Sequence, residues 1–588
     1  MSMTHITGAR AIIECLLEQG VDMVFGYPGG TILNVYDELY KLNENAESSG
    51  APHITHILTA HEQGAAHAAD GYARASGKVG VVLATSGPGA ANLVTGIATA
   101  YMDSVPLVAI TCNVALALLG KDSFQEIDIA GITSPITKHN YIVKDVNELV
   151  PTIREAFAIA KSGRQGPVLI DVPKNVTAEM VDYDAQRDAS AYSKKILPSS
   201  AGSSERLQRI TFCEAPLDDE IKNAARAIND SERPLIFAGG GVVASGACNE
   251  LKTLAEKCNI PVAVSLMGKT AFPQTHKLAT GLIGMHGTKA SNTAINTADL
   301  VIALGVRFSD RVISDSNFFA KNARILHIDI DKAEVNKNID TWVSLSGNVK
   351  EVLQRIIPHI SPIAHNAMRE DWLKKIDELK KTVPAMYSKK SALHPKRICE
   401  IIREKAGSDA LICTEVGQHQ IWAAQFYEFV TPRTFLTSGG LGTMGFGLGA
   451  AIGAQLAFPE RYVINIAGDG CVRMNSIEFA TIAHYKLPVI EVIFNNGTLG
   501  MVRQWQNLFY AKRFSETTLD FAPDFVKLAD AYGIAGFSAT TEADFEKAFT
   551  ASLSSRAPAI IDCKIEIDEL VLPMVPTGKP VDAQLFEI

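Results

Sequence analysis

Polar side chains that could bind a metal ion and a phosphate stand at the ends of two successive strands in the last third of the sequence. The apolar run 461–467 predicts a buried strand, and Gly468-Asp469-Gly470 follows it directly. A second apolar run, 489–494, predicts another strand, which ends at Asn495-Asn496. Because parallel sheets bind ligands at the carboxyl ends of their strands, these residues are expected to share one site.

A helix is expected between the two strands, so that the segment forms one βαβ unit. Asn475 and Glu478 have the spacing of a helix N-cap and its third residue, and this helix would run to about Tyr485. The Gly-Asp-Gly segment would then be a turn that carries its aspartate at the edge of the sheet.

The oxygen atoms of this unit suit Mg²⁺. Asp469 offers a carboxylate, Asn496 a side-chain carbonyl and Thr498 a backbone carbonyl. Mg²⁺ takes few protein ligands beside phosphate oxygens and water. Gly468 and Gly470 would let the backbone approach a diphosphate closely. Either dipeptide alone is an ordinary turn, but the pair, one βαβ unit apart, favours a ligand site.

Composition excludes several classes of protein. The 588 residues imply more than one domain, and 47% apolar with 20% charged residues is typical of a globular protein. A net charge of -9 without a basic block argues against nucleic acid as a partner. No apolar run is long and clean enough for a membrane span, and residues 1–7 lack a targeting pattern, so we expect a cytoplasmic protein. The nine cysteines are scattered singly and predict reduced thiols, with Cys471 interpreted as packing.

The order of the elements predicts an α/β protein with three doubly wound parallel-sheet domains. We expect a first domain at 1–185, a linker at 186–215, a central domain at 216–365, a third domain at 366–565 and a tail at 566–588. The linker assignment rests on a stretch rich in Ser, Ala, Lys and Gln. Both outer domains place glycine turns at strand ends, which suggests an internal duplication.

Individual elements follow from apolar periodicity and glycine turns. The first domain should hold helices at 7–20 and 65–75 and strands at 23–25, 79–84, 105–111 and 167–172. The central domain should hold strands at 235–238, 262–265, 300–304 and 325–330, and a charged helical stretch at 368–381 should lead out of it. The third domain should hold a strand at 410–414, a helix from Ala450 and a last strand at 559–564, before a turn-rich segment, 575–580, that is an expected cover for a site entrance.

One glycine motif offers an alternative interpretation. Gly239, Gly241 and Ala244 fit G-x-G-x-x-A after a strand, a pattern of dinucleotide-binding folds. A nicotinamide dehydrogenase would carry an acidic residue about 20 positions further on. That residue is missing, so the motif alone is weak.

Longer matches identify a family. The whole chain resembles the catalytic subunits of the acetohydroxyacid synthase, or acetolactate synthase, family of thiamin diphosphate (ThDP) enzymes. The matching segments are 25–30, 61–65, 85–89 with Asn92, 124–126, 136–140, 166–171, 173–174, 284–287, 307–308, 310–312, 468–496 and 500–505. The resemblance implies pyrimidine-binding, central FAD-type and diphosphate-binding domains. It also implies a carboligase of branched-chain amino acid biosynthesis that decarboxylates pyruvate and condenses the two-carbon unit with pyruvate or 2-ketobutyrate.

The resemblance further implies which residues contact the cofactor. Glu62 corresponds to the catalytic glutamate that would hydrogen-bond the aminopyrimidine of ThDP, whereas by spacing alone it is equally well a first-turn acid of a helix. Met444 matches the residue that holds ThDP in its bent shape, although most methionines simply pack in cores. Mg²⁺ would be held by Asp469, Asn496 and Thr498. The residues expected at ThDP are Pro28, Gly29, Glu62, Thr85, Asn92, Val416, Gln418, His419, Gly442, Met444, Gly468, Asp469, Gly470, Cys471, Asn496 and Met501.

A second group of matches implies the pocket for the second 2-keto acid. A guanidinium at Arg311 can pair bidentately with its carboxylate, and an indole at Trp505 can pack against its alkyl group. Taken alone, Trp505 would more often be a core residue and Arg311 a surface ion pair. The expected catalytic and substrate residues beside Glu62 are Phe124, Gln125, Lys174, Arg311, Met501 and Trp505.

The central domain of the family binds FAD that takes no net part in the reaction. A residue such as His286 would, without this match, be interpreted as a structural histidine. The residues expected at FAD are Arg164, Gly239, Gly240, Gly241, Ser265, Leu266, Met285, His286, Gly305, Arg307, Asp310, Asp329 and Ile330.

Four sites depart from the family pattern. Thr31 stands where the family has a small alanine beside the thiazolium, and residues 112–115 replace the usual Gly-Gln-Val-Pro. Ser309 and Asn348 each replace an aspartate near the flavin. These changes bear on inhibitor sensitivity, acceptor preference and flavin affinity, and leave Glu62 and the metal ligands unchanged.

Other hypotheses stay open beside the carboligase. A related ThDP decarboxylase, a pyruvate oxidase or a specialised acetolactate synthase paralogue would share the cofactor site, but a simple decarboxylase has no use for an acceptor pocket. An inactive ThDP-fold scaffold would have lost Glu62 or the metal ligands, which are present. The resemblance also implies a homodimer or homotetramer with active sites between chains and a small regulatory subunit as a further partner.

Overall fold

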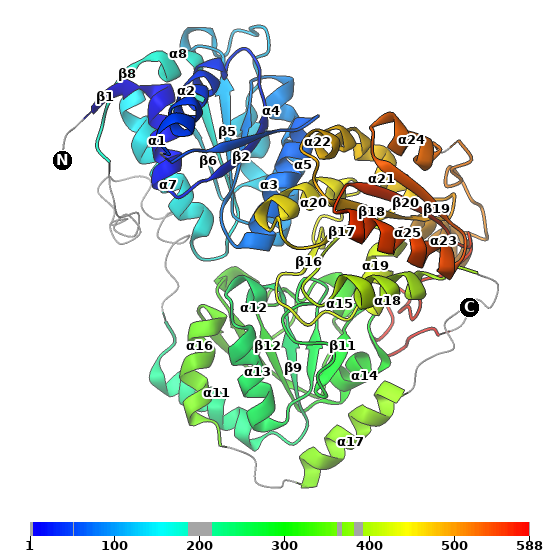
Figure 1. Ribbon diagram of the computed structural model, residues 1–588. Coiled ribbons are helices and arrows are strands. Elements are labelled where there is room, and N and C mark those ends of the chain that lie inside the picture. Colours follow the sequence, from blue (N-terminus) through cyan, green and yellow to red (C-terminus); the bar gives the residue numbers. More distant parts are fainter. Residues whose placement is uncertain are drawn as a thin grey trace.

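Three parallel six-stranded sheets, each flanked by helices, make up the computed structural model (Figure 1). The structure describes residues 4–50, 52–185, 215–361, 367–381, 392–521 and 523–586. The expectation of three doubly wound α/β domains is confirmed. The expected linker lies almost wholly outside the described residues.

The first domain comprises residues 4–185, and the two ends of this range lie next to each other. Its sheet has the spatial order β3 (Thr55–Leu58), β2 (Met23–Tyr27), β4 (Gly80–Ala84), β5 (Leu107–Asn113), β7 (Pro167–Pro173) and β6 (His139–Ile142). The helices are α1 (Gly8–Glu18), α2 (Leu33–Ser49), α3 (Glu62–Ser76), α4 (Pro88–Asn92), α5 (Val94–Asp103), α6 (Ile129–Thr133), α7 (Leu149–Lys161) and α8 (Lys174–Ala178). A two-stranded antiparallel ribbon pairs β1 (Thr4–Thr7) with β8 (Met180–Tyr183).

The middle domain has the strand order of dinucleotide-binding folds. Its sheet runs β11 (Ala279–Leu282), β10 (Val262–Val264), β9 (Pro234–Ala238), β12 (Leu300–Leu304), β13 (Arg324–Asp329) and β14 (Val343–Ser346). The helices are α11 (Asp218–Asp230), α12 (Gly240–Ala244), α13 (Cys248–Cys258), α14 (Lys289–Thr297), α15 (Asp310–Ile313), α16 (Val349–Ile356) and α17 (Ala367–Lys381). The strand order reverses between β9 and β12, and ligands of such sheets bind at this point.

The third domain repeats the strand order of the first. Its sheet runs β16 (Phe435–Thr437), β15 (Leu411–Thr414), β17 (Val463–Gly468), β18 (Val489–Asn495), β20 (Ala559–Lys564) and β19 (Ala535–Ala539). The helices are α18 (Pro395–Ala406), α19 (Gln418–Phe426), α20 (Phe446–Ala457), α21 (Asp469–Asn475), α22 (Phe479–His484), α23 (Gly500–Phe509), α24 (Phe525–Ala531) and α25 (Glu542–Ser555). The shared topology agrees with the duplication that the glycine turns suggested.

The start of the helix after β17 was predicted wrongly. Helix α21 begins at Asp469 itself, without an intervening turn, and Asn475 ends it instead of capping a new one. The side chains of the expected capping box are used elsewhere. Asn475 Nδ2 donates to the carbonyl of Gly445, and Glu478 accepts from the backbone N–H groups of Ala60 and His61.

Helix α17 lies against the middle sheet, not in the third domain to which the range 366–565 assigned it. Trp372 packs in the apolar cluster of the middle domain and donates its indole N–H to the carbonyl of Pro234. Arg369 donates to the backbone carbonyls of Ser231 and Cys258. Most charged residues of this helix lie on its outer face. They did not indicate that Arg369 and Trp372 attach the helix to the middle domain.

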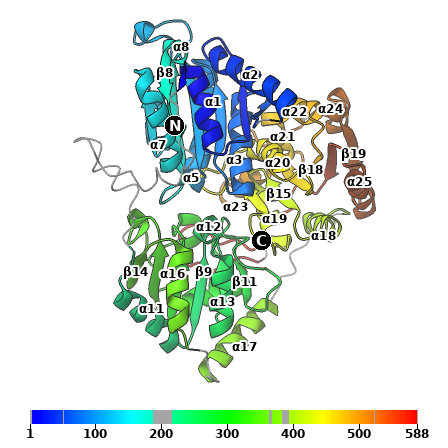
Figure 2. The same cartoon turned by 60° about the vertical axis from the view of Figure 1, so that its left-hand side comes forward.

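The first and third domains pack through α3 and α20, which lie side by side in Figure 2. Both helices are rich in glycine and alanine, so their backbones approach closely. A Cβ atom at Gly71 would lie 2.5 Å from the Cα of Ala450, and one at Gly453 would overlap the backbone of Ala68. Among the described residues, no helix is long and apolar enough to cross a bilayer.

Replacing Gly71 with Ala should destabilise this helix pair. Overpacking a close contact costs about 1–3 kcal/mol, so we expect a lower free energy of unfolding in a chemical denaturation curve. Gly30→Ala is the matched control, because nothing lies within 4 Å of a Cβ at Gly30. Equal stability of both variants would show that the α3–α20 contact tolerates a methyl group.

Candidate active site

A small cavity of about 80 Å³ lies at the carboxyl ends of β15, β17 and β18. The sheet brings these strand ends together, although they are far apart in the sequence. Most of the residues expected at the diphosphate and the metal line it. They are Val416, Gln418, His419, Met444, Gly468, Asp469, Gly470, Cys471, Asn496, Thr498 and Met501.

Asp469 is the electrostatic centre of this cavity. The residue is only 1% exposed, and its Oδ2 atom has no hydrogen-bond partner among the described residues. Burial raises the pKa of this carboxyl to about 6, so it is mainly ionised at neutral pH. A buried anion without a partner is costly unless a cation neutralises it, and the neighbouring amide of Asn496 supplies a second oxygen.

Glycine is required at two positions of the cavity wall, because neighbouring side chains already occupy the space that a Cβ atom would need. A Cβ atom at Gly468 would lie 2.8 Å from His419 Nδ1, and one at Gly470 would lie 2.6 Å from Leu499 Cδ2. Burial lowers the pKa of His419 to about 3, so its ring is neutral. Cys471 donates to the carbonyl of Val416 and burial raises its thiol pKa well above the usual value, which agrees with a packing role.

The residues expected at the pyrimidine lie in the first domain, after the strands β2, β3 and β4. Glu62 begins α3 and is buried, and Asn92 donates to its Oε2 atom over 2.9 Å. A Cβ atom at Gly29 or Gly89 would collide with the side chain of Thr85. These residues, with Pro28, line neither the small cavity nor the large one described next, so one chain holds the two halves of the expected ThDP site apart.

Thr31 connects two of the departures from the family pattern. Its hydroxyl donates to the carbonyl of Cys112 and accepts from the backbone N–H of Ser86 over 3.1 Å. Next along β5, Asn113 donates to Asp171 over 2.7 Å, and burial raises the pKa of Asp171 to about 6. The unusual residues at 31 and 112–113 therefore take part in two neighbouring sets of polar contacts at the end of β5.

A large cavity of about 1160 Å³ lies at the switch point of the middle sheet, between all three domains. All thirteen residues expected at FAD line it, as do Val416, Gly442 and Met501 of the ThDP set. The backbone forms its floor, because a Cβ atom at Gly241 would lie 2.6 Å from the Cα of Gly305. Val416 and Met501 line both cavities, so the two cavities are neighbours.

Polar groups at the rim of the large cavity are held in fixed positions. Arg164 bonds Glu334 Oε1 at 2.9 Å and Asp331 Oδ2 at 3.2 Å, and its Nε atom donates to Ser104. His286 lies within 3.1 Å of the Pro573 carbonyl, and burial lowers its pKa to about 4. The imidazole is therefore neutral and contributes shape and a hydrogen bond rather than charge.

The expected acceptor residues fall into two groups. Arg311 and Trp505 line the large cavity. Phe124, Gln125 and Lys174 lie on the first domain, where Phe124 is 88% exposed and Gln125 packs over Gly87. One chain does not bring the two groups together.

Comparison with known proteins agrees with this division into three domains. Models of the N-terminal TPP binding domain, the central domain and the C-terminal TPP binding domain of thiamine pyrophosphate enzymes match residues 6–132, 221–356 and 415–563. A protein named "Probable acetolactate synthase large subunit" from Methanocaldococcus jannaschii is 47% identical over 97% of this chain and 94% of its own length. The acetolactate synthases of Arthrospira platensis and Mycobacterium bovis are 44% and 42% identical over 98% and 99% of this chain, and 97% and 92% of their own lengths.

The chain belongs to the acetolactate synthase family of thiamine pyrophosphate enzymes. The resemblance in the sequence motifs is thereby confirmed. Thiamine pyrophosphate is the same compound as ThDP, and the matches to its two binding-domain models, at 6–132 and 415–563, contain the two groups of expected ThDP residues.

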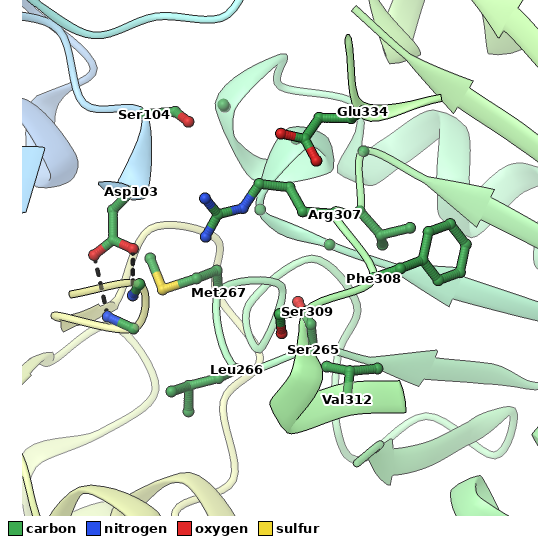
Figure 3. Close-up of a pocket in the computed structure, with 18 of the residues that line it drawn as sticks. Asp103, Ser104, Ser265, Leu266, Met267, Arg307, Phe308, Ser309, Val312 and Glu334 are labelled. Atoms are coloured by element: carbon green, nitrogen blue, oxygen red, sulfur yellow. Dashed lines mark hydrogen bonds between the residues drawn. The ribbon is translucent and has the colours of Figure 1, made fainter. Parts of the chain in front are cut away.

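The glycine loop at 439–442 is held by a residue of the first domain that the sequence motifs did not reveal. Asp103, at the end of α5, accepts from Gly440 N at 2.7 Å and from Gly439 N at 3.1 Å. Figure 3 shows this carboxylate reaching from the first domain to the loop, while Arg307 extends into the cavity from the middle domain. Arg74 neutralises Asp103 at 3.0 Å. A single acid after a helix gave no signal of such a contact.

Replacing Asp103 with Ala should loosen this loop. Hydrogen bonds to charged groups contribute about 1.5–3 kcal/mol each, so amide hydrogen exchange at 438–446 should accelerate about 10- to 100-fold. Asp103→Asn keeps one acceptor and should fall between Ala and wild type, while the amides of β20 serve as the internal reference. Unchanged exchange in the loop would show that Asp103 does not hold it.

Proposed function

We propose that this protein decarboxylates one pyruvate and joins the two-carbon unit to a second 2-keto acid. Two pyruvates would give 2-acetolactate and CO₂, and pyruvate with 2-ketobutyrate would give 2-aceto-2-hydroxybutyrate and CO₂. The observation that carries the proposal is the partnerless, buried Asp469 oxygen in a glycine-walled cavity, in a chain of the acetolactate synthase family.

The proposed cofactors are ThDP and Mg²⁺. Asp469, Asn496 and the Thr498 carbonyl would hold the metal, and Gly468 and Gly470 would admit the diphosphate. This set fits a hard cation, because it joins one carboxylate with neutral oxygens and leaves other positions to phosphate and water. When bound, ThDP supplies an electron sink that lets a 2-keto acid lose CO₂ and its remaining carbons act as a nucleophile.

Glu62 is the proposed catalytic acid of the first domain. Asn92 occupies its Oε2 atom, so Oε1 is the oxygen that would meet the pyrimidine ring. Gly89 keeps this oxygen accessible, because a Cβ atom there would lie 3.1 Å from Oε1. A buried carboxylate at this place can hold or move a proton at the ring nitrogen.

We propose that two chains complete each active site. Glu62 and Asp469 of one chain line no common cavity, and Gln125 and Lys174 are likewise apart from Arg311 and Trp505. A homodimer is the smallest assembly that can bring one copy of each group together, and a homotetramer would pair two such dimers. Because the similar protein of Methanocaldococcus jannaschii is named a large subunit, a small regulatory subunit is a further proposed partner.

FAD is the proposed occupant of the large cavity. The order of the middle sheet, the glycine contact at Gly241 and Gly305, and a volume of about 1160 Å³ suit a dinucleotide. A nicotinamide remains a weaker candidate, because the acidic ribose partner is missing from the sequence.

The direct test is to incubate the pure protein with pyruvate, ThDP and Mg²⁺, with and without FAD, and to identify the products. Acetolactate, with one CO₂ for two pyruvates, is the expected result. Acetaldehyde would instead indicate a simple decarboxylase, and peroxide formed under air would indicate an oxidase.

Replacing Glu62 with Gln should retain ThDP and Mg²⁺ but lower turnover by about 100-fold or more, because general acid–base catalysis contributes about 10²–10⁴. Cofactor binding is measured by fluorescence quenching and turnover by acetolactate formation. Glu44→Gln, at an exposed site on α2, is the control. Full activity of the Glu62 variant would exclude this role.

Replacing Trp505 with Leu should change the choice between pyruvate and 2-ketobutyrate as acceptor. Losing an indole that packs against an alkyl group alters discrimination by about 1–3 kcal/mol at most, measured as the product ratio in a competition assay. Trp342→Leu is the control, because Trp342 is an exposed middle-domain tryptophan that stacks on Arg324 and lines neither cavity. An unchanged ratio would remove Trp505 from the determinants of specificity.

A further inference from the structure

Three side-chain amides form a continuous hydrogen-bonded chain from the small cavity to the C-terminal tail. Asn496 Nδ2 donates to Gln418 Oε1 at 3.2 Å, and Gln418 Nε2 donates to Gln504 Oε1 at 3.0 Å. Gln504 is 1% exposed and has no role in the function proposed above. We propose that Gln504 is a positioning residue that, through Gln418, turns the carbonyl oxygen of Asn496 toward a divalent cation. The inference rests on the proposed metal site.

Backbone groups of the tail determine which way Gln504 points. Its Oε1 atom accepts from Val571 N at 2.9 Å, and its Nε2 atom donates to Val571 O at 3.1 Å. A backbone N–H only donates and a carbonyl only accepts. Both ends of the Gln504 amide are therefore fixed by one residue of the tail.

The orientation of Gln418 follows from the same argument. Its Nε2 atom donates to the Glu569 carbonyl at 2.9 Å as well as to Gln504 Oε1. Neither of these oxygens can donate, so the NH₂ group must face the tail and Oε1 must face Asn496. Turning this amide around would bring three oxygens together in a buried place.

The side-chain amide of Asn496 can therefore take only one orientation. Gln418 Oε1 requires a donor, which is the NH₂ group of Asn496, so Asn496 Oδ1 lies on the other side of the amide. Among the described residues, Oδ1 accepts a single long bond, 3.3 Å, from Thr498 N. An amide ligates a hard cation through oxygen and not through its protonated nitrogen, so the opposite orientation would remove the ligand.

The protein offers a matched control for this amide relay, which consists of Asn496, Gln418 and Gln504. Gln425 also anchors the tail, because its Nε2 atom donates to the Leu572 and His286 carbonyls, each at 3.2 Å. Within the described part of the chain, Gln425 makes no hydrogen bond to Gln418, Gln504 or Asn496. Gln504→Met and Gln425→Met each replace one tail anchor with an apolar side chain of similar size, and only the first interrupts the relay.

The test is Mn²⁺ titration of the cofactor-stripped full-length protein in saturating ThDP, followed by the electron paramagnetic resonance signal of the free ion. Partners that orient metal ligands typically contribute 10- to 100-fold to metal affinity. We expect Gln504→Met to weaken Mn²⁺ binding about 10-fold or more, with Gln425→Met within about 2-fold of wild type. Gln504→Glu keeps the acceptor for Gln418, and its carboxyl, protonated because of burial, can still donate to the Val571 carbonyl, so this variant should retain most of the affinity.

Equal affinity of Gln504→Met and wild type, or equal weakening by Gln425→Met, would overturn the relay. Gln418→Leu interrupts the chain one residue nearer the cavity, so wild-type affinity of that variant would overturn it even if Gln504→Met did not fold. Failure of the proposed function gives a different result, because the wild-type protein itself would then show no ThDP-dependent Mn²⁺ binding.

Discussion

A buried carboxylate, one oxygen of which has no hydrogen-bond partner among the described residues, is the constraint on which this structure depends. Asp469 stands at the end of β17, where the parallel sheet ends and helix α21 begins. Removing an anion from water is costly unless a cation offsets it. The surroundings offset that cost in part, because the neutral His419 ring and nearby backbone N–H groups offer dipoles. The proposed cation would offset the rest.

The same principle of strand ends organises the whole molecule. In each sheet, residues of the expected sites follow the strands on either side of the point where the strand order reverses, namely β2 and β4, β9 and β12, and β15 and β17. Glu62 and Asn496 follow the neighbouring strands β3 and β18. Small residues then let these ends approach other groups, as at Gly241 against Gly305 and Gly468 against His419. Asp103 joins the first domain to the third, and the C-terminal tail joins the third domain to the middle one through His286 and Met285.

Sequence patterns predicted the sheets and the site motifs because both depend on local signals, namely apolar runs and glycine at strand ends. They failed where a side chain acts at long range. Asn475 and Glu478 have the spacing of a capping box, yet neither caps a local helix. Asn475 donates to the backbone carbonyl of Gly445, and Glu478 accepts from the backbone N–H groups of Ala60 and His61. Gln504 and Asp103 gave no signal at all, because an amide or an acid acquires its partner only when remote segments meet.

Glu478 also shows how the two separated halves of the site remain in register within one chain. The segment that starts at Asp469 runs through α21 to Glu478, whose carboxylate accepts from the backbone immediately before Glu62. Only glycine fits at position 64, because a Cβ atom there would overlap the Glu478 carboxylate. The backbone that carries the proposed catalytic acid is thus fastened to the helix that carries the proposed metal ligand. A displacement at one of them must strain the buried contact or move the other, although the two side chains line no common cavity.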